Sequence, residues 1–499
     1  MSGIKKLAGQ TLWYGLSTIA ARLINYLLTP YLTYKLSSVV YGEQSIVYSF
    51  IPFMNVVFTY GMETAFFRFS NNKDKQEVYN TTSISLIVST IIFSVLLVLF
   101  KNPIAEILQI TAHPEYISIA AAIIGVDALC GIPFAKLRQE NRPLKFALTK
   151  IMGILMVVFF TYFFISVCPN FIAKNPAHWL AAYYKPDWSV GYILLANLIQ
   201  NILVLLLLSK EFLGFKWHFN QVLWKEIMLY SLPLIIVGFG GMVNEVFDRI
   251  MLGWWAPVST VEAAKAEVGI YAACYKLSIL ISLAVQAFRM GAEPFFFKQS
   301  QESNAQKVYA RVMKFFVITL CFMFLLVALY LDVWKQFIRN EEMWVGLKVV
   351  PILLLANMFL GIYYNLSVWY KLSNKTMAGA WITIVGALIT VGINWYFIPL
   401  YSYVACAWAT LACYGTMMVM SYIWGQKAYP IPYAWRKLLA YIGIVLSFFF
   451  IQKGLLYLYN PFWFELVTGS ILLSIFAWFI LLVEQKEFKK IPVVGKFIR

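Results

Sequence analysis

Hydrophobic residues run through this chain in long, unbroken stretches bounded by charged residues, Pro or Gly. Fourteen such stretches can be counted, at residues 11–34, 42–66, 80–100, 116–137, 146–167, 188–209, 227–256, 268–297, 312–331, 346–370, 377–399, 402–425, 438–458 and 463–483. About 20 apolar residues are needed for a helix to cross a bilayer, whereas a membrane β-barrel shows segments of about ten alternating residues. The pattern therefore predicts an all-α polytopic membrane protein with about 14 transmembrane helices.

The composition supports this interpretation. Hydrophobic residues make up 61% of the 499 positions and charged residues 13%, against about 25% charged in a soluble domain. So few charges cannot cover the outside of a soluble enzyme. The six cysteines form no CxxC pair, the three histidines are scattered in loops, and no GxxxxGK[ST] motif occurs. We expect no metal site and no cofactor.

Lysine and arginine are distributed unevenly between the connections. With the N-terminus in the cytoplasm, 27 of them fall on the cytoplasmic side and 9 on the other. Positive charge collects on the cytoplasmic side of membrane proteins, so both termini are predicted to be cytoplasmic. The net charge of +17 is then explained by the basic residues of the cytoplasmic connections, which face membrane lipids. It gives no reason to expect a nucleic acid partner. The largest outer loop, about 168–187, is expected to lie against the membrane surface.

Two distant segments of the chain resemble each other. Residues 61–68 (GMETAFFR) end the second stretch, and residues 291–298 (GAEPFFFK) end the eighth. The starts match more weakly, Tyr41-Gly42 with Val268-Gly269, and at an offset that differs by three residues. A shift of six helices is even, so the two halves keep the same orientation and form a parallel repeat. This predicts a lobe over 1–215, a second over 216–430, a cavity between them, and two added helices within 431–499.

Several charged residues fall inside the predicted helices. The bases are Arg22, Arg249, Lys276 and Arg289, and the acids are Asp127, Glu245 and Asp248. A charge at mid-bilayer costs roughly 2.5–3.5 kcal/mol, so each of these should face a partner or a water-filled cavity. The alternative to a cavity role is a set of internal ion pairs, namely Glu245–Arg249, Asp248–Lys276 and Arg289–Glu293.

Arg22 differs from the other bases because its own helix offers no acid. We expect it to face the cavity, with Asp127 or a substrate anion as its counter-ion. Asp127 lies at a similar depth and is then either the partner of Arg22 or a titratable switch.

Two stretches carry a family resemblance. Residues 247–253 (FDRIMLG) and 269–277 (GIYAACYKL) place Asp248-Arg249 before a Gly-x-Tyr-x-x-x-Tyr-Lys pattern, and residues 394–410 run from Asn394 through Ile398-Pro399 to Ala409-Thr410. The whole chain resembles the polysaccharide (Wzx-type) flippases of the multidrug/oligosaccharidyl-lipid/polysaccharide exporter superfamily. It departs from many relatives around Ser402 and Cys406, where glycines are common.

The resemblance implies two six-helix lobes around a central cationic cavity, plus two C-terminal helices, in the bacterial cytoplasmic membrane. It implies transport rather than enzymatic catalysis, with a lipid-linked anionic oligosaccharide carried on a polyprenyl pyrophosphate as substrate. Other membrane proteins of polysaccharide assembly are further candidate partners. Arg22, Arg249, Lys276 and Arg289 would bind the pyrophosphate, because cations that replace water suit such an anion. Asp127, Asp248 and Glu245 would couple transport or form ion pairs.

Other functions remain open at this point. A lipid II flippase would use the same mechanism with a different sugar, and a cation-coupled multidrug antiporter of the same superfamily would need a net acidic cavity. A glycan polymerase or glycosyltransferase would need a large outer loop or a soluble domain with paired acids. A channel is disfavoured by the two-lobe repeat.

Overall fold

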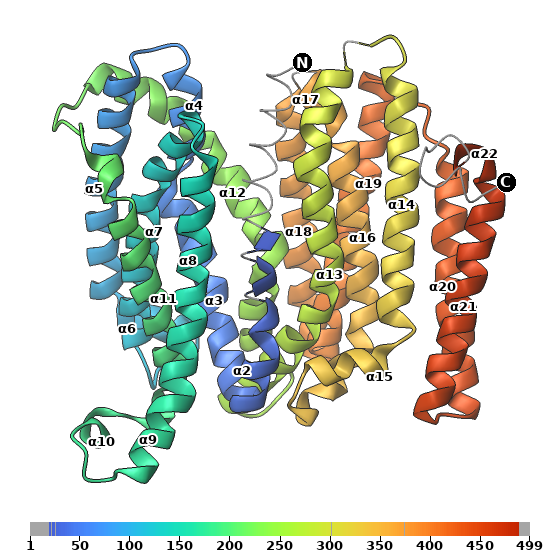
Figure 1. The fold of residues 1–499 in the computed structure, drawn as a ribbon, viewed down its shortest axis with the longest axis horizontal. Helices are drawn as coiled ribbons and strands as arrows, with labels where there is room; N and C mark the ends of the chain where they lie inside the picture. Colours follow the sequence, from blue (N-terminus) through green and yellow to red (C-terminus); the bar gives the residue numbers. More distant parts are fainter. Residues whose placement is uncertain (1–18, 21, 25, 301, 374, 489–499) are drawn as a thin grey trace.

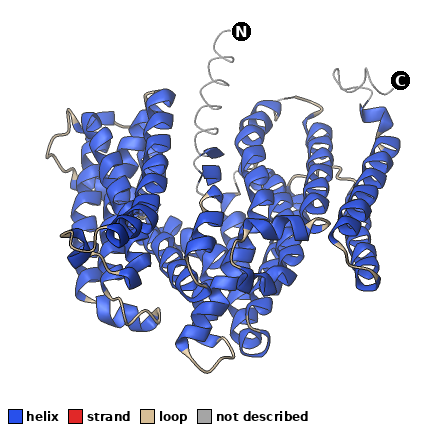
Figure 2. Cartoon of the chain, turned by 60° about the horizontal axis from the view of Figure 1, so that its bottom comes forward, coloured by secondary structure: helices blue, strands red, loops and turns tan. Residues whose placement is uncertain are grey.

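The computed structural model describes residues 19–20, 22–24, 26–300, 302–373 and 375–488. Its regular elements, within these residues, are all helices (Figure 2). Thirteen of them are long and apolar enough to span a membrane. They confirm the predicted polytopic helical fold and agree with thirteen of the fourteen predicted stretches. The remaining one, 11–34, lies partly outside the described residues.

From Thr29 onward, the described residues of the first half form ten α-helices. They are α2 (Thr29–Lys35), α3 (Ser38–Thr59), α4 (Met62–Ser70), α5 (Lys75–Leu99), α6 (Lys101–Ile107), α7 (Glu115–Gln139), α8 (Pro143–Tyr162), α9 (Cys168–Lys174), α10 (Leu180–Tyr183) and α11 (Ser189–Leu207). A π-helical turn, Phe163–Val167, joins α8 to α9. Helices α5, α7, α8 and α11 pack against one another as one group, at the left of Figure 1.

The second half begins with two long helices and ends with a separate pair. Its helices are α12 (Gln221–Trp255), α13 (Val261–Gln299), α14 (Ala305–Ala328), α15 (Leu331–Trp334), α16 (Val350–Leu366), α17 (Val368–Leu372), α18 (Thr376–Tyr401), α19 (Tyr403–Ala428), α20 (Trp435–Leu458), α21 (Phe462–Val483) and α22 (Gln485–Phe488). Helices α12, α13, α14, α16, α18 and α19 form the second group, and α20 and α21 pack on its outer side against α14 (Figure 1).

The second predicted stretch, 42–66, is not one continuous helix. Tyr60 and Gly61 both have positive φ, 30° and 74°, and they separate α3 from α4. A positive φ costs glycine little and other residues more, so Gly61 makes the break possible. The matching Gly291 lies inside the uninterrupted α13. The two matched segments therefore differ in backbone conformation at this point.

The two groups meet where α3 crosses α13. Gly42 of α3 and Gly269 of α13 lie face to face: a methyl group on Gly42 would overlap the carbonyl oxygen of Lys265, and one on Gly269 would overlap that of Ser38. Small residues let two backbones approach this closely in a membrane. These are the two glycines that the sequence repeat aligned. The crossing therefore joins equivalent positions of the two halves.

Polar contacts close the same end of the molecule, which carries few basic residues and is called the opposite face below. The ammonium of Lys265 lies 2.6 Å from the Glu43 carboxylate, and both side chains are largely buried. The Arg339 amide donates to the Thr33 hydroxyl, at 3.1 Å. The Ser38 hydroxyl donates to the Glu342 carboxylate, at 3.4 Å. The α2–α3 turn is thus held against both α13 and the segment before α16.

An ion cluster fastens the added helices at the other end, the basic face. The buried carboxylate of Glu484, just after α21, lies 2.7 Å from Lys314 of α14 and 2.6 Å from Lys437 of α20. It also accepts a hydrogen bond from Tyr441. Burial raises the pKa of Glu484, but the hydrogen bonds from Lys314, Lys437 and Tyr441 outweigh it and hold the pKa below its ordinary value.

We predict that Gly42→Ala destabilises the protein, because the added methyl meets backbone atoms that cannot move aside. Overpacking of this kind costs about 1–3 kcal/mol, seen as a lower melting temperature in detergent. Gly392→Ala in α18 is the matched control, since nothing lies within 4 Å of the added methyl. Equal melting temperatures for Gly42→Ala and the wild type would contradict the close crossing.

We predict that Glu484→Gln lowers the melting temperature at neutral pH, because it leaves Lys314 and Lys437 facing a neutral group. Removing one member of a buried ion pair costs about 3 kcal/mol or more. The pKa of Glu484 is lower in the folded than in the unfolded protein. Its contribution to the free energy of unfolding is therefore complete above the unfolded-state pKa and is lost as the pH falls through the folded-state pKa. The gap between variant and wild type should therefore narrow in acid. Glu302→Gln, at an exposed site on the same face, should show no gap at any pH.

Central cavity and intramembrane charges

A polar cavity of about 350 Å³ lies among helices of the second group. Its polar lining residues are Arg22, Asn244, Glu245, Tyr275, Ser282, Gln286, Arg289, Asn357, Tyr363, Tyr364, Thr383 and Tyr414. All except Arg22 come from the second half of the chain, on α12, α13, α16, α18 and α19. Arg22 comes from the helical segment before α2, so the two halves share this cavity.

Two of the four predicted cations line the cavity. Arg22 is exposed within the structure, and it has no ion-pair partner among the described residues. Arg289 lies over the ring of Tyr364, with its guanidinium carbon 4.7 Å from the ring centroid. The side chain of Glu293 lies outside the described part of the chain, so the expected Arg289–Glu293 pair stays a prediction.

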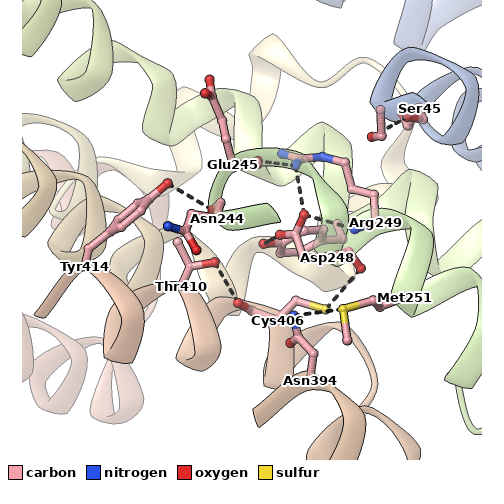
Figure 3. A network of polar contacts seen from close by, with 12 residues as sticks. Ser45, Asn244, Glu245, Asp248, Arg249, Met251, Asn394, Cys406, Thr410 and Tyr414 are labelled. Atoms are coloured by element: carbon pink, nitrogen blue, oxygen red, sulfur yellow. Dashed lines mark hydrogen bonds and ion pairs between the residues drawn. The ribbon is translucent and has the colours of Figure 1, made fainter. Parts of the chain in front are cut away.

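Arg249 is held inside the second group and does not line the cavity. Its guanidinium lies 2.9 Å from the Asp248 carboxylate and donates to the main-chain oxygen of Glu245 at 2.8 Å (Figure 3). It also lies over the ring of Tyr275, 4.3 Å from the centroid. Asp248 is 4% exposed and accepts a further hydrogen bond from the Tyr271 hydroxyl at 2.6 Å. Each charge of this pair is therefore compensated locally.

Two predicted pairings thus have different partners in the structure. Asp248 pairs with Arg249 rather than with Lys276, and Arg249 contacts the backbone of Glu245 rather than its carboxylate. Equal depth in the membrane was the basis for pairing Asp248 with Lys276, but depth does not say which way a side chain points. The carboxylate of Glu245, exposed on the cavity wall, has no hydrogen-bond or ion-pair partner in the described part of the chain.

Lys276 lines a second, smaller cavity of about 100 Å³. The other polar residues of this cavity belong to the first half of the chain: Thr29, Tyr41, Gln44, Ser45, Tyr48 and Asn197. Lys276 and Arg289 are 13 residues apart on α13, which turns their side chains about 140° from each other at 3.6 residues per turn. This rotation explains why one helix supplies cations to two separate cavities.

Asp127 lies in the first group and does not contact Arg22. Its carboxylate accepts a hydrogen bond of 2.9 Å from the side-chain amide of Asn55, and it is not among the residues that line the central cavity. The predicted Arg22–Asp127 pair is therefore not formed in this conformation.

The sequence held a signal for the cavity wall that charge counting missed. Tyr275, Ser282, Gln286 and Arg289 recur on α13 at intervals of seven, four and three residues, which places them along one face of the helix. All four line the cavity. A search for polar residues at helical spacing, rather than for charges alone, would have found this wall.

Comparisons with known proteins agree with this architecture. Lsg locus protein 1 of Haemophilus influenzae is 23% identical over 297 residues, which is 58% of this chain and 66%, just under two thirds, of that protein. The solved structure of the lipid II flippase MurJ in an inward closed conformation matches with a TM-score of 0.71 at 14% identity, over 95% of this chain and 99% of that one. An inward-facing transporter of the multidrug resistance MATE family matches with a TM-score of 0.59 at 12% identity, over 85% and 96%. At such identities the structural matches show the fold.

The model of one protein family covers more than half of the sequence. It describes polysaccharide biosynthesis proteins and matches residues 7–300. This polytopic membrane protein therefore belongs to the polysaccharide biosynthesis protein family.

Proposed function

We propose that this protein is a flippase that moves a polyprenyl-pyrophosphate-linked oligosaccharide across the bacterial cytoplasmic membrane for surface polysaccharide synthesis. The observation that carries the proposal is the central cavity, in which Arg22 of the first half and Arg289 of the second line one polar space. A pyrophosphate offers paired acceptor oxygens that suit the planar, permanently charged guanidinium group. Binding by both arginines would link the substrate to both lobes.

The lining also suits a sugar next to that anion. Tyrosines and Gln286 offer ring faces and hydrogen-bonding groups on the wall that holds Arg289. The side-chain oxygen of Gln286 is buried and has no hydrogen-bond partner among the described residues. A buried acceptor without a partner costs about 1–3 kcal/mol, and a sugar hydroxyl or a water molecule would satisfy it.

The closed opposite face supports alternating access. Gly42 and Gly269 bring α3 and α13 into backbone contact there, and the Lys265–Glu43 pair adds to the seal. The excess of lysine and arginine on the other face supports its assignment to the cytoplasmic side. On this assignment the conformation is one that receives substrate from the cytoplasmic leaflet, and parting of the α3–α13 crossing would release it outside.

The two alternatives differ in what they require of the cavity. A multidrug antiporter that takes cations needs a net acidic site, whereas the charged lining residues are two arginines and one glutamate. A lipid II flippase fits the same cavity, since lipid II is also linked through a pyrophosphate. The structural likeness to MurJ is compatible with that alternative. A lipid II flippase and the proposed oligosaccharide flippase differ in the sugar that the substrate carries.

We predict that Arg22→Ala abolishes export without loss of folded protein, because Arg22 contributes charge to the cavity and forms no ion pair with any described residue. In cells lacking this protein, lipid-linked oligosaccharide should accumulate on the cytoplasmic leaflet, and the wild-type chain should reverse this while Arg22→Ala should not. Arg22→Lys should restore part of the activity. Arg436→Ala, an exposed arginine at the start of α20, is the control that should export normally. Full export by Arg22→Ala would end the assigned role of Arg22.

We predict the contrasting result for Asp248→Asn, since its carboxylate compensates a buried guanidinium. Loss of one partner of such a pair costs about 3–5 kcal/mol, so the yield of folded protein and its melting temperature should fall. Export per folded molecule should change much less than for Arg22→Ala. An Asp248→Asn protein with wild-type stability and no export would instead make Asp248 part of the transport machinery.

A further inference from the structure

An apolar cavity lies outside the central one, between α5 and α12. It has a volume of about 560 Å³, within the roughly 300–1,000 Å³ typical of small-ligand sites. Most of its lining is aliphatic or aromatic, including Val88 and Ile92 of α5 and Leu232 and Ile235 of α12. Val88, Ile92 and Leu232 are 45%, 51% and 51% exposed, so the groove opens toward the bilayer.

The few polar groups in this groove are already engaged with one another. The hydroxyls of Tyr60 and Ser85 are 2.7 Å apart, Ser89 donates to the Tyr60 hydroxyl, and the indole nitrogen of Trp224 donates to Ser85. The lining therefore presents mainly carbon to an occupant. A hydrocarbon chain fits such a surface, whereas a sugar or a phosphate does not.

The end of the groove at the basic face is covered by the connection between the two halves of the chain. The main-chain amide of Lys216 donates to the Asn80 side chain, one helical turn before the groove-lining Ile84 of α5. Phe219, from the same connection, lines the groove itself. Lys225 precedes Leu232 by seven residues on α12, so the two share one face of the helix.

These positions put cations at the basic-face end of the apolar groove. Lys216 and Lys225 are exposed, and neither side chain has an ion-pair partner within the described residues. Of the acids nearby, Glu226 lies 3.1 Å from Lys73, and Glu77 accepts a hydrogen bond from the neutral amide of Asn220. The local charge complements an anionic headgroup, and each lysine near a membrane surface contributes about 1 kcal/mol to binding an anionic lipid.

Packing separates this groove from the central cavity. Gly238 of α12 lies against Val56 of α3, where an added methyl would be 2.8 Å from a Val56 carbon. The rings of Phe53 and Phe239 are also in contact, with centroids 5.0 Å apart. The groove-lining residues of α12 end at Ile235, and its cavity-lining residues begin at Gly241. The two spaces share no lining residue, and this packed segment of α12 lies between them in the present conformation.

We propose that the α5–α12 groove binds an acyl chain of a resident anionic phospholipid, with its headgroup phosphate at Lys216 and Lys225. The lipid comes from the leaflet at the basic face and is separate from the transported molecule. It fills the space between α5 of the first group and α12 of the second. This site does not depend on which substrate the central cavity takes.

Native mass spectrometry of the purified full-length protein tests the site, with phosphatidylglycerol and phosphatidylcholine of the same chain length as probes. The wild type should retain phosphatidylglycerol on the order of tenfold more strongly. The double variant Lys216→Gln/Lys225→Gln should lose this preference. Its matched control, Lys298→Gln/Lys307→Gln, neutralises two exposed lysines of the basic face near the α13–α14 connection and should keep it.

A groove-filling variant, Val88→Trp, should reduce retention of both lipids. Any charge preference that remains should come from binding at other sites. Unchanged phosphatidylglycerol binding in both Val88→Trp and the double lysine variant would overturn the proposal. So would displacement of phosphatidylglycerol by an equimolar polyprenyl phosphate, because the groove would then belong to the transported lipid. Melting temperatures of the variants separate a lost lipid site from a lost fold.

Discussion

The close crossing of α3 and α13 is the contact on which the rest of the structure depends. Gly42 and Gly269 allow two backbones to touch, and the buried side chains around them, such as Ile46 and Tyr271, belong to one apolar cluster that includes both halves of the chain. Lipid offers no hydrophobic drive for helices to associate, so packing of this kind must hold them. Because the contact lies at one end, the helix groups are joined there while the polar cavity forms among the helices beyond it.

The crossing also explains how the membrane charges are divided. Near it, the Asp248–Arg249 pair is buried and satisfied by Tyr271 and by the backbone of Glu245. Farther from it, Arg22, Arg289 and Glu245 line a cavity that can hold water or a ligand. The energetic requirement is the same in both places, since a charge in low dielectric needs compensation. For Asp248 and Arg249 the fold itself supplies the compensating groups. For Arg22 and Glu245 water or a bound ligand must supply them.

Helix α12 connects these features because it touches both halves of the chain. Its first turns pack beside α4 and α5 and line the apolar groove, and its later turns line the polar cavity and pack on α18. A lipid in the groove and a substrate in the cavity would thus contact one helix at different heights. Any change in the angle between the groups must move this helix, which gives the groove a physical connection to the transport cycle proposed above.

The sequence by itself determined the helical membrane fold, the thirteen spans that the structure describes and the repeat that aligned Gly42 with Gly269. These follow from local rules, because the length and hydropathy of a segment decide whether it crosses a bilayer. It also identified the charged residues, but not which of them share a space. The separation of Lys276 from Arg289, the pairing of Asp248 with Arg249, and the contact of Asp127 with Asn55 were decided only by the tertiary structure. The physical reason is that sequence position gives the depth of a side chain in the membrane, whereas its partners depend on the direction in which each packed helix is rotated.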